Sequence, residues 1–255
     1  MNDISKYLVY LIVLTGLAWV YAGFKMKGMP FVRDIHESLY DEPEQEETSI
    51  ENFTFEYAEK EYVAQPLYEY KINGLVVSNS DITSMLDGYR MGRSINLKDL
   101  CLTWGDNLKN SAFRKMKFWN KSSTCFYEFG EYKKYLKTFN GNNLSNNHLV
   151  TDREYLIKKI NRVKPGDQVR ISGYLVNYFP KGASEKLAQT STSRTDSGDV
   201  ATEIVYVDMF HIIEPGKETW TMMYSVFKKL FYFLILIEII YLCVAFQIQK
   251  EFKKE

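Results

Sequence analysis

Two long apolar runs near the ends of the chain dominate its pattern of hydrophobic and polar positions. Residues 7–24, YLVYLIVLTGLAWVYAGF, contain no charged side chain, and residues 230–246 contain only one, Glu238. A helix needs roughly 20 mostly apolar residues to cross the hydrocarbon core of a bilayer. The pattern therefore predicts two transmembrane helices, at residues 7–24 and 228–247.

Each apolar run has a second interpretation. The first could be a cleaved signal peptide, although it is long for one and no small-x-small cleavage site follows it. The second could be the buried core helix of a soluble domain. If both runs span a membrane, the N-terminal tail at 1–6 and the charged tail at 248–255 share one side. Lysines flank both runs, so the positive-inside rule barely discriminates between the two orientations.

Glu238 is the unusual position of the second run. An unpaired charge in a membrane helix costs at least about 2.5 kcal/mol on insertion scales, so this carboxyl group should be protonated or hydrogen-bonded. Thr15 and Tyr10 are the partners that the first run offers, and a helix of another subunit or another protein is the functional alternative. The sequence thus predicts an intramembrane contact at Glu238.

The segment between the apolar runs changes character near residue 66. Positions 34–61 hold eleven Asp or Glu and one Lys, with little apolar periodicity. We therefore expect an acidic linker at 25–65, with a docking strip for a basic partner as the alternative. Residues 66–215 are expected to form the main β-rich domain, and residues 216–227 a juxtamembrane linker.

Alternating apolar and polar positions predict five or six strands in the main domain. The clearest stretches are 67–79, 124–129, 168–179 and 203–213. Thr151 and Glu154 have the spacing of a capping box, which predicts a short helix there and leaves the preceding polar residues in a loop. A short helix before a Gly-Asp turn and a Gly-containing strand is typical of a small OB-like curved barrel. The expected fold class is therefore mainly β (α+β) and OB-like, with a β-sandwich as the alternative.

Composition narrows the function classes. The chain has 255 residues, 45% of them hydrophobic, which is enough for a sizeable core. Its 32 basic and 32 acidic side chains cancel, which disfavours a non-specific nucleic-acid binder. The three cysteines show no zinc-site spacing. Because Cys243 lies in the second apolar run, Cys101 and Cys125 are the candidate disulfide pair, and such a bond needs an oxidising compartment.

Several strings in the middle of the chain resemble a group of bacterial proteins that have an N-terminal membrane anchor, an extracytoplasmic domain and no assigned activity. The strings are LCLTWG at 100–105, SNNHL at 145–149, VKPGDQVRISGYLV at 163–176 and STSRTDSG at 191–198. The resemblance covers about residues 67–213, and the second apolar run departs from the pattern of the group. It implies a bacterial inner-membrane protein with its main domain outside the cytoplasm, and it transfers no catalytic residue.

Two polar segments supply the candidate binding residues. They are Asn146, Asn147 and His148 in SNNHL, and Ser193, Arg194 and Asp196 in TSTSRTDSGD. His148 could serve a hydrolase as a general base, but no Gly-x-Ser-x-Gly motif is present. Asparagines beside a histidine equally hydrogen-bond the backbone of a loop. The three histidines are too far apart in sequence to predict a metal site, and no cofactor is expected.

These patterns favour a non-catalytic binding or scaffolding protein of the bacterial envelope, with other membrane or envelope proteins as partners and a homo-oligomer as a further option. One alternative is a membrane-tethered hydrolase that uses His148. The other is an OB-like nucleic-acid-binding module in the cytoplasm, because eight basic residues alternate with aromatic ones between 109 and 137. Such alternation is more often the solvated and core faces of the same strands, so a nucleic-acid partner is disfavoured.

Overall fold

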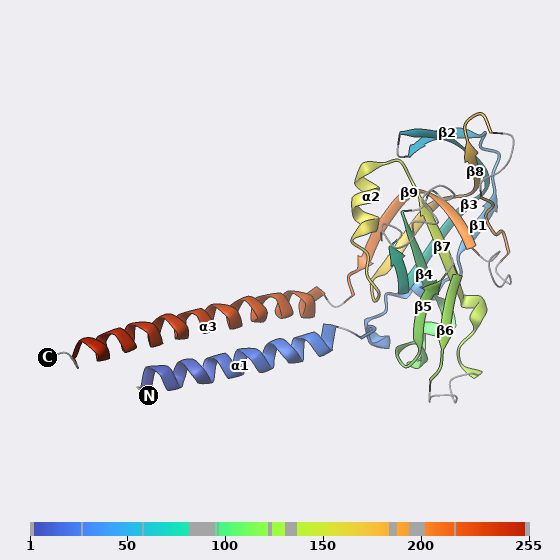
Figure 1. Cartoon of the computed structure of the whole chain (residues 1–255). Coiled ribbons are helices and arrows are strands. Elements are labelled where there is room, and N and C mark those ends of the chain that lie inside the picture. The colour runs from blue at the N-terminus through green and yellow to red at the C-terminus, as the bar shows by residue number, and fades with distance from the viewer. Residues whose placement is uncertain are drawn as a thin grey trace. The chain divides into compact units, whose positions relative to one another are not determined.

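The chain divides into two compact units. The computed structural model describes residues 3–26, 28–57, 59–81, 95, 97–121, 124–130, 137–183, 188–193, 202–216 and 218–252. One unit consists of Met1–Gly28 and Lys217–Glu255, and the other is Met29–Gly216. The first is a pair of apolar helices, and the second is a mixed α+β domain built on one large sheet (Figure 1).

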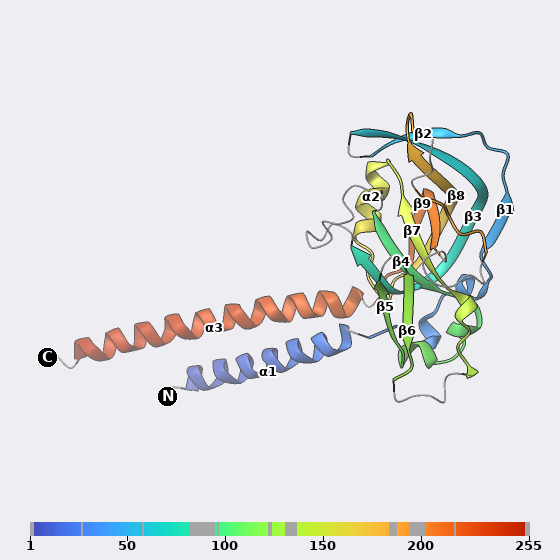
Figure 2. The same cartoon turned by 45° about the vertical axis from the view of Figure 1, so that its right-hand side comes forward.

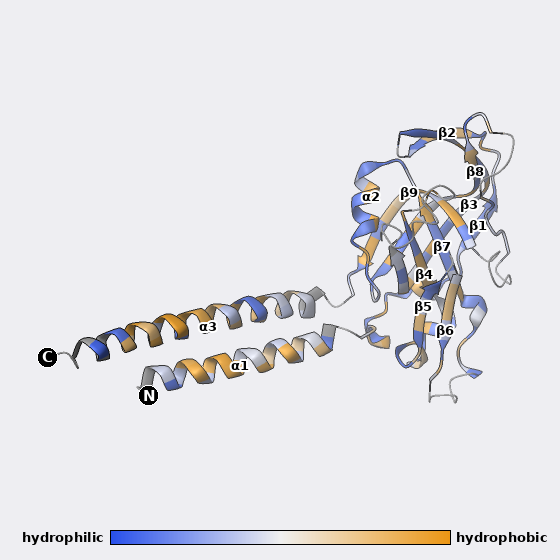
Figure 3. Cartoon of the chain, in the orientation of Figure 1, coloured by the Kyte–Doolittle hydropathy of each residue, from blue (hydrophilic) through white to orange (hydrophobic). Residues whose placement is uncertain are grey.

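The helix pair consists of α1, Asp3–Met26, and α3, Glu218–Phe252. The two helices lie side by side in both Figure 1 and Figure 2, and Figure 3 shows hydrophobic residues along both. Each contains a candidate membrane span, Ser5–Lys25 in α1 and Trp220–Gln247 in α3. The expected juxtamembrane linker is corrected here, because α3 already begins at Glu218.

The second unit contains nine strands and one short α-helix in the part of the chain that the structure describes. The strands of the large sheet are β1 Glu44–Glu47, β2 Phe53–Tyr57, β3 Lys60–Asp81, β4 Lys98–Thr103, β7 Leu144–Val150, β8 Gln168–Pro180 and β9 Thr202–Glu214. A separate hairpin is formed by β5 Lys117–Lys121 and β6 Thr124–Glu128. The helix α2 spans Glu154–Asn161.

The long strand β3 organises the sheet, because it pairs antiparallel with both β4 and β8. From β4 the pairing continues antiparallel to β7, then parallel to β9, and finally antiparallel from β9 to β8. Apolar side chains of all these strands fill one core cluster, and Leu156 and Ile160 of α2 complete it. These strands therefore share one main core cluster, to which α2 contributes, and the domain has two smaller clusters as well.

The expected acidic linker at 25–65 is corrected by the structure. Its strand β1 pairs with residues 68–71 of β3, and β2 pairs with residues 60–64 of the same strand. Several apolar residues of this acidic stretch are buried, among them Leu39 with none of its surface exposed and Phe55 with 3% exposed. The many carboxylates predict a solvated linker, but the buried apolar residues and the pairing with β3 hold this segment on the domain.

Residues 144–150 are a second correction, since the predicted polar loop is the buried strand β7. Its backbone pairs with β4 on one side and β9 on the other. The capping box is also absent: the Thr151 hydroxyl accepts a hydrogen bond from the Arg153 amide at 3.3 Å, and Glu154 forms an ion pair with Lys158 at 3.1 Å. The helix exists as expected, but its N-cap residue, Arg153, makes no side-chain capping hydrogen bond.

The hairpin β5–β6 lies against the sheet and is joined to it covalently. Cys101 of β4 and Cys125 of β6 form a disulfide with a Cα–Cα distance of 5.7 Å. Beside it, the Asn120 side chain accepts a hydrogen bond from the Ser78 hydroxyl and donates one to Asn146 Oδ1 at 2.8 Å. The outer side of β4 and β7 is thereby covered by the hairpin.

Candidate functional site

A pocket of about 360 Å³ lies over strands β1, β3, β8 and β9. The residues that give it its chemical character are Glu46, Glu69, Tyr174, Asp208 and Met209. Gly173 forms part of its wall, and a Cβ atom there would lie 2.0 Å from the Tyr206 carbonyl oxygen. The β8–β9 pairing therefore leaves room only for glycine at this position.

Two carboxylates lie next to each other at the pocket, and the lysine that lines it, Lys71, is paired with another carboxylate. Glu46 and Glu69 are directly paired between β1 and β3, and like charges in such cross-strand positions are destabilising. The next pair along the same two strands, Glu44 and Lys71, forms an ion pair at 2.6 Å. Within the described part of the chain, neither Glu46 nor Glu69 has a hydrogen-bond or ion-pair partner.

The opposite wall of the pocket combines an aromatic ring, a thioether and a third carboxylate. Met209 is 57% exposed, and Asp208 forms an ion pair with Arg153 at 2.7 Å. Burial, followed by the negative charges of Asp208 and Glu69, raises the pKa of Tyr174. Carboxylates beside an aromatic ring and a polarisable sulfur suit a cationic group of a ligand.

The pocket was not predicted as a site, although the sequence contained a signal for it. Glu44 and Glu46 belong to the acidic stretch at 34–61, for which a docking strip was the alternative interpretation. The missing information was the register that sets β1 beside β3. Glu69, twenty-three positions after Glu46, cannot be joined to it by spacing alone.

His148, the candidate base, is buried with 4% of its surface exposed. Its Nδ1 atom lies 2.9 Å from Asp99 Oδ1, and its Nε2 atom lies 3.2 Å from the Ile95 carbonyl oxygen. Both ring nitrogens are therefore engaged by groups inside the domain, and neither is placed to take a proton from a nucleophile.

The neighbours of His148 are also engaged in the interior. Asn147 accepts a hydrogen bond from the Tyr70 hydroxyl at 3.2 Å and donates one to the Ser145 hydroxyl at 2.8 Å. Asn146 is held by Asn120 of the hairpin. The expected exposed binding segment at Asn146, Asn147 and His148 is therefore corrected to a buried polar row.

The second expected binding segment lies only partly within the described residues. Ser193 is exposed, its amide donates to the Ser191 hydroxyl at 3.2 Å, and its carbonyl accepts from that hydroxyl at 3.0 Å. Gln45 of β1 donates a hydrogen bond to the Thr192 carbonyl at 3.1 Å. Arg194 and Asp196 lie outside the described residues.

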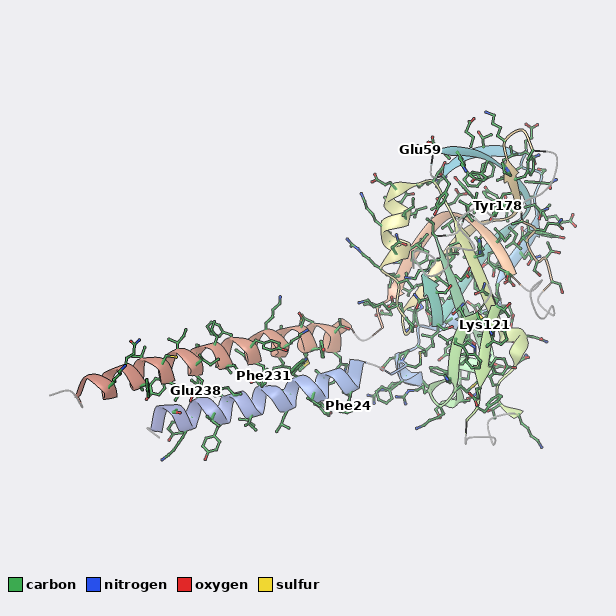
Figure 4. All side chains as sticks on the ribbon, in the orientation of Figure 1. Phe24, Glu59, Lys121, Tyr178, Phe231 and Glu238 are labelled. Atoms are coloured by element: carbon green, nitrogen blue, oxygen red, sulfur yellow. A yellow bond between two sulfur atoms is a disulfide. The ribbon has the colours of Figure 1, made fainter. Side chains whose placement is uncertain are left out.

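Glu238 makes a different contact within the helix pair from those expected. The Ser5 hydroxyl donates a hydrogen bond to Glu238 Oε1 at 2.7 Å, whereas the Thr15 hydroxyl bonds the backbone of its own helix. Figure 4 labels Glu238 and Phe231 on α3, and Phe231 packs on Gly16. Glu238 Oε2 is buried and has no hydrogen-bond partner among the described residues.

No family model, curated protein or solved structure matches this chain. The resemblance to anchored bacterial proteins therefore stays a prediction. Among the described residues, no group of three or more His, Cys, Asp or Glu side chains is arranged to hold a metal ion.

Proposed function

We propose that this protein is a non-catalytic, membrane-anchored binding or scaffolding protein of the bacterial envelope, and that its domain binds a cationic group of a partner. The observation that carries the proposal is the pocket, in which Glu46 and Glu69 lie side by side while its lining lysine, Lys71, is paired with another carboxylate. A cation of the partner would relieve that repulsion, and the Tyr174 ring and Met209 would contact its apolar part.

The strand pairing supports an OB-like domain over a β-sandwich. Five strands pair in the sequence β3, β4, β7, β9, β8 and again β3, with β7 and β9 parallel. The helix α2 lies between β7 and β8 along the chain. OB-folds are five-stranded Greek-key barrels that are partly open.

The proposed location outside the cytoplasm is supported by the Cys101–Cys125 disulfide, because disulfides persist in oxidising compartments. Candidate spans at both ends of the domain support anchoring in the inner membrane. Glu238 Oε2 supports a partner inside the bilayer, since a donor from another helix would satisfy it. A second copy of the chain or another membrane protein would supply that helix.

The two alternative functions are less well supported. OB-folds bind oligonucleotides on the face of their second and third strands, and in this domain the hairpin β5–β6 covers those strands, β4 and β7. Phe113 and Phe139 of the basic and aromatic stretch are buried. A hydrolase would need a free lone pair on His148, and both of its ring nitrogens face acceptors.

The pocket is tested with a cationic probe. Trilysine is titrated into the full-length protein in nonionic detergent, and the dissociation constant is measured by calorimetry for the native chain and for Glu46→Gln/Glu69→Gln. We expect the double variant to bind more weakly, and equal binding would contradict the pocket. The matched control is Glu56→Gln, because Glu56 is also paired with a glutamate, Glu61, but that partner is neutralised by Lys181.

The location is tested separately by thiol labelling on intact cells. Cys243 is the one free cysteine, so a Cys243→Ser background with Lys181→Cys presents a single reactive thiol on the domain. A membrane-impermeant reagent should label it without lysis. Labelling only after lysis would place the domain in the cytoplasm and reopen the nucleic-acid alternative.

A further inference from the structure

A second charged surface lies at the beginning of the domain. Phe31 is 43% exposed, and the guanidinium carbons of Arg33 and Arg114 lie 5.2 and 4.0 Å from the centre of its ring. Arginine at this distance is attracted by the face of an aromatic ring. Phe31, Arg33 and Arg114 together are called the Phe31 clamp below.

Arg114 is fixed in the clamp by its backbone neighbours. It ends the short 3-10 turn Ala112–Arg114, whose Phe113 is fully buried in a cluster that also includes Val32 and Ile35. The Arg114 Nε atom donates a hydrogen bond to the Met29 carbonyl at 3.4 Å. Its terminal nitrogens have no hydrogen-bond partner among the described residues.

Arg33 is the exposed side of the clamp, with 82% of its side chain accessible to solvent. Its protein partner is the carboxylate of Asp34 at 3.5 Å, also well exposed. Exposed ion pairs of this kind contribute little to stability. Both arginines can therefore give N–H donors to an external anion.

The covalent chain limits how far the Phe31 clamp lies from the first candidate span. α1 ends at Met26, and the five residues from there to Phe31 extend over at most about 18 Å. The domain's other connection is tied to the same region: Asp167 Oδ1 accepts a hydrogen bond from the Gly216 amide at 2.7 Å, and Gln168 Oε1 accepts one from the His36 amide at 2.7 Å. The segments that lead to both candidate spans thus start from one firmly bonded region.

We propose that the Phe31 clamp binds the phosphate of an anionic phospholipid in the leaflet next to the domain. A guanidinium group can donate two parallel N–H bonds to a phosphate, which an ammonium group cannot do with the same geometry. The exposed ring of Phe31 would contact the glycerol region between the two arginines. This inference rests on the membrane anchoring proposed above.

The test uses the full-length protein in nonionic detergent and a soluble short-chain phosphatidylglycerol as the probe. Basic residues near an anionic lipid surface contribute about 1 kcal/mol each, so Arg33→Gln/Arg114→Gln should bind the probe about thirtyfold more weakly. Arg33→Lys/Arg114→Lys keeps both charges and loses the paired donors, and should fall between the native chain and the Gln variant. Short-chain phosphatidylcholine should bind weakly to all of them.

The matched control is Lys60→Gln, which removes an exposed cation at the β2–β3 end of β3 and should leave binding unchanged. Unchanged binding in the double Gln variant, or an equal loss in Lys60→Gln, would overturn the clamp. Inorganic phosphate that binds as tightly as the lipid probe would overturn the assignment to lipid. Melting temperatures of all variants check that the domain remains folded.

Insertion into lipid nanodiscs separates this inference from the anchoring on which it rests. All the variants, like the native chain, should insert, because α1 and α3 are unchanged. Failure of the native chain to insert would overturn the proposed anchoring and the clamp together. Insertion with unaltered lipid selectivity in the double Gln variant would overturn the clamp alone.

Discussion

The buried polar row of β7 and the pocket over β1, β3, β8 and β9 use polar residues in opposite ways. In the row, His148 and Asn147 are almost fully buried and their side chains are hydrogen-bonded inside the domain, to β7 itself and to residues distant in sequence. In the pocket, Glu46 and Glu69 are exposed and adjacent, and neither has an ion-pair partner in the described residues. The row is satisfied internally, whereas the pocket is left for a ligand.

The difference shows that an unusual polar string is a poor guide to function. SNNHL attracts attention because buried strands rarely contain four polar residues in succession, but buried polar groups must be hydrogen-bonded and a complete network meets that need. The glutamates of the pocket are ordinary surface residues in sequence. Only their opposite positions on neighbouring strands make them unfavourable without a ligand.

The largest expected effect is on the row. Asp99→Ala removes the buried carboxylate that pairs with His148 at 2.9 Å and should lower the free energy of unfolding by about 3–5 kcal/mol, the range found when one member of a buried ion pair is removed. Denaturant unfolding of the fragment 29–216, which is a compact unit, measures it. The matched control is Asp208→Ala at the pocket, whose partly exposed pair with Arg153 should contribute less than about 1 kcal/mol. Similar losses in both variants would remove the distinction between row and pocket.

Opening the disulfide should have the next largest effect, again on the row. Cys101→Ser/Cys125→Ser should cost about 2–5 kcal/mol, as removal of native disulfides from small domains does. The hairpin would also separate more easily from Asn146, so the Asn146 side-chain amide should exchange its hydrogens faster. The pocket, which the hairpin does not line, should bind trilysine as before. Loss of probe binding would show that the two regions are coupled.

Part of this fold could be predicted from the sequence. The two apolar helices follow from long uncharged runs, and β6, β8, β9 and α2 follow from local periodicity. Strand β7 could not be predicted, because its polar side chains are satisfied by residues distant in sequence, such as Asp99 and Tyr70. A propensity scale assigns the asparagines to loops, because it contains no information about those distant partners.

The candidate site was even less accessible to sequence reasoning. The pocket depends on the pairing of Glu46 with Glu69 and on the wall at Gly173, where only glycine fits. Both are properties of strand register. Similarly, Glu238 was recognised as unusual from its apolar surroundings, but its Ser5 partner depends on how α1 and α3 are aligned. Local chemistry indicates which residue needs a partner, and the fold decides which partner it meets.

Alkaline pH offers a smaller test at the border of the two regions. Burial, followed by the hydrogen bond to Asp152, raises the pKa of Tyr206 above the ordinary value of 10.0. Below pH 10.0 the Tyr206 hydroxyl is protonated in both the folded and the unfolded chain, so its contribution to the free energy of unfolding is complete. Above it the unfolded chain loses the proton first, so the free energy of unfolding should fall as pH rises.

Tyr206→Phe is the variant for this measurement. It should cost about 1 kcal/mol at neutral pH through loss of the hydrogen bond, and its free energy of unfolding should fall less steeply above pH 10.0 than that of the native fragment. Tyr57 and Tyr174 also have raised pKa values, so part of the slope should remain. If the free energy of unfolding falls equally steeply with pH in the native and variant fragments, Tyr206 does not contribute to the alkaline loss of stability.

The smallest effect on stability, and the only one expected to be a gain, comes from the pocket. Glu69→Gln removes the repulsion with Glu46 and should raise the free energy of unfolding by about 0.5 kcal/mol, while it weakens trilysine binding. Glu56→Gln should show neither change, because Lys181 already neutralises the partner of Glu56.

Replacing a residue that is retained for structure lowers the stability of the protein, as is expected for Asp99. A gain in stability together with a loss of binding would mark Glu69 as retained for a ligand, and a loss of stability would return the pocket to the class of structural polar groups to which the row belongs.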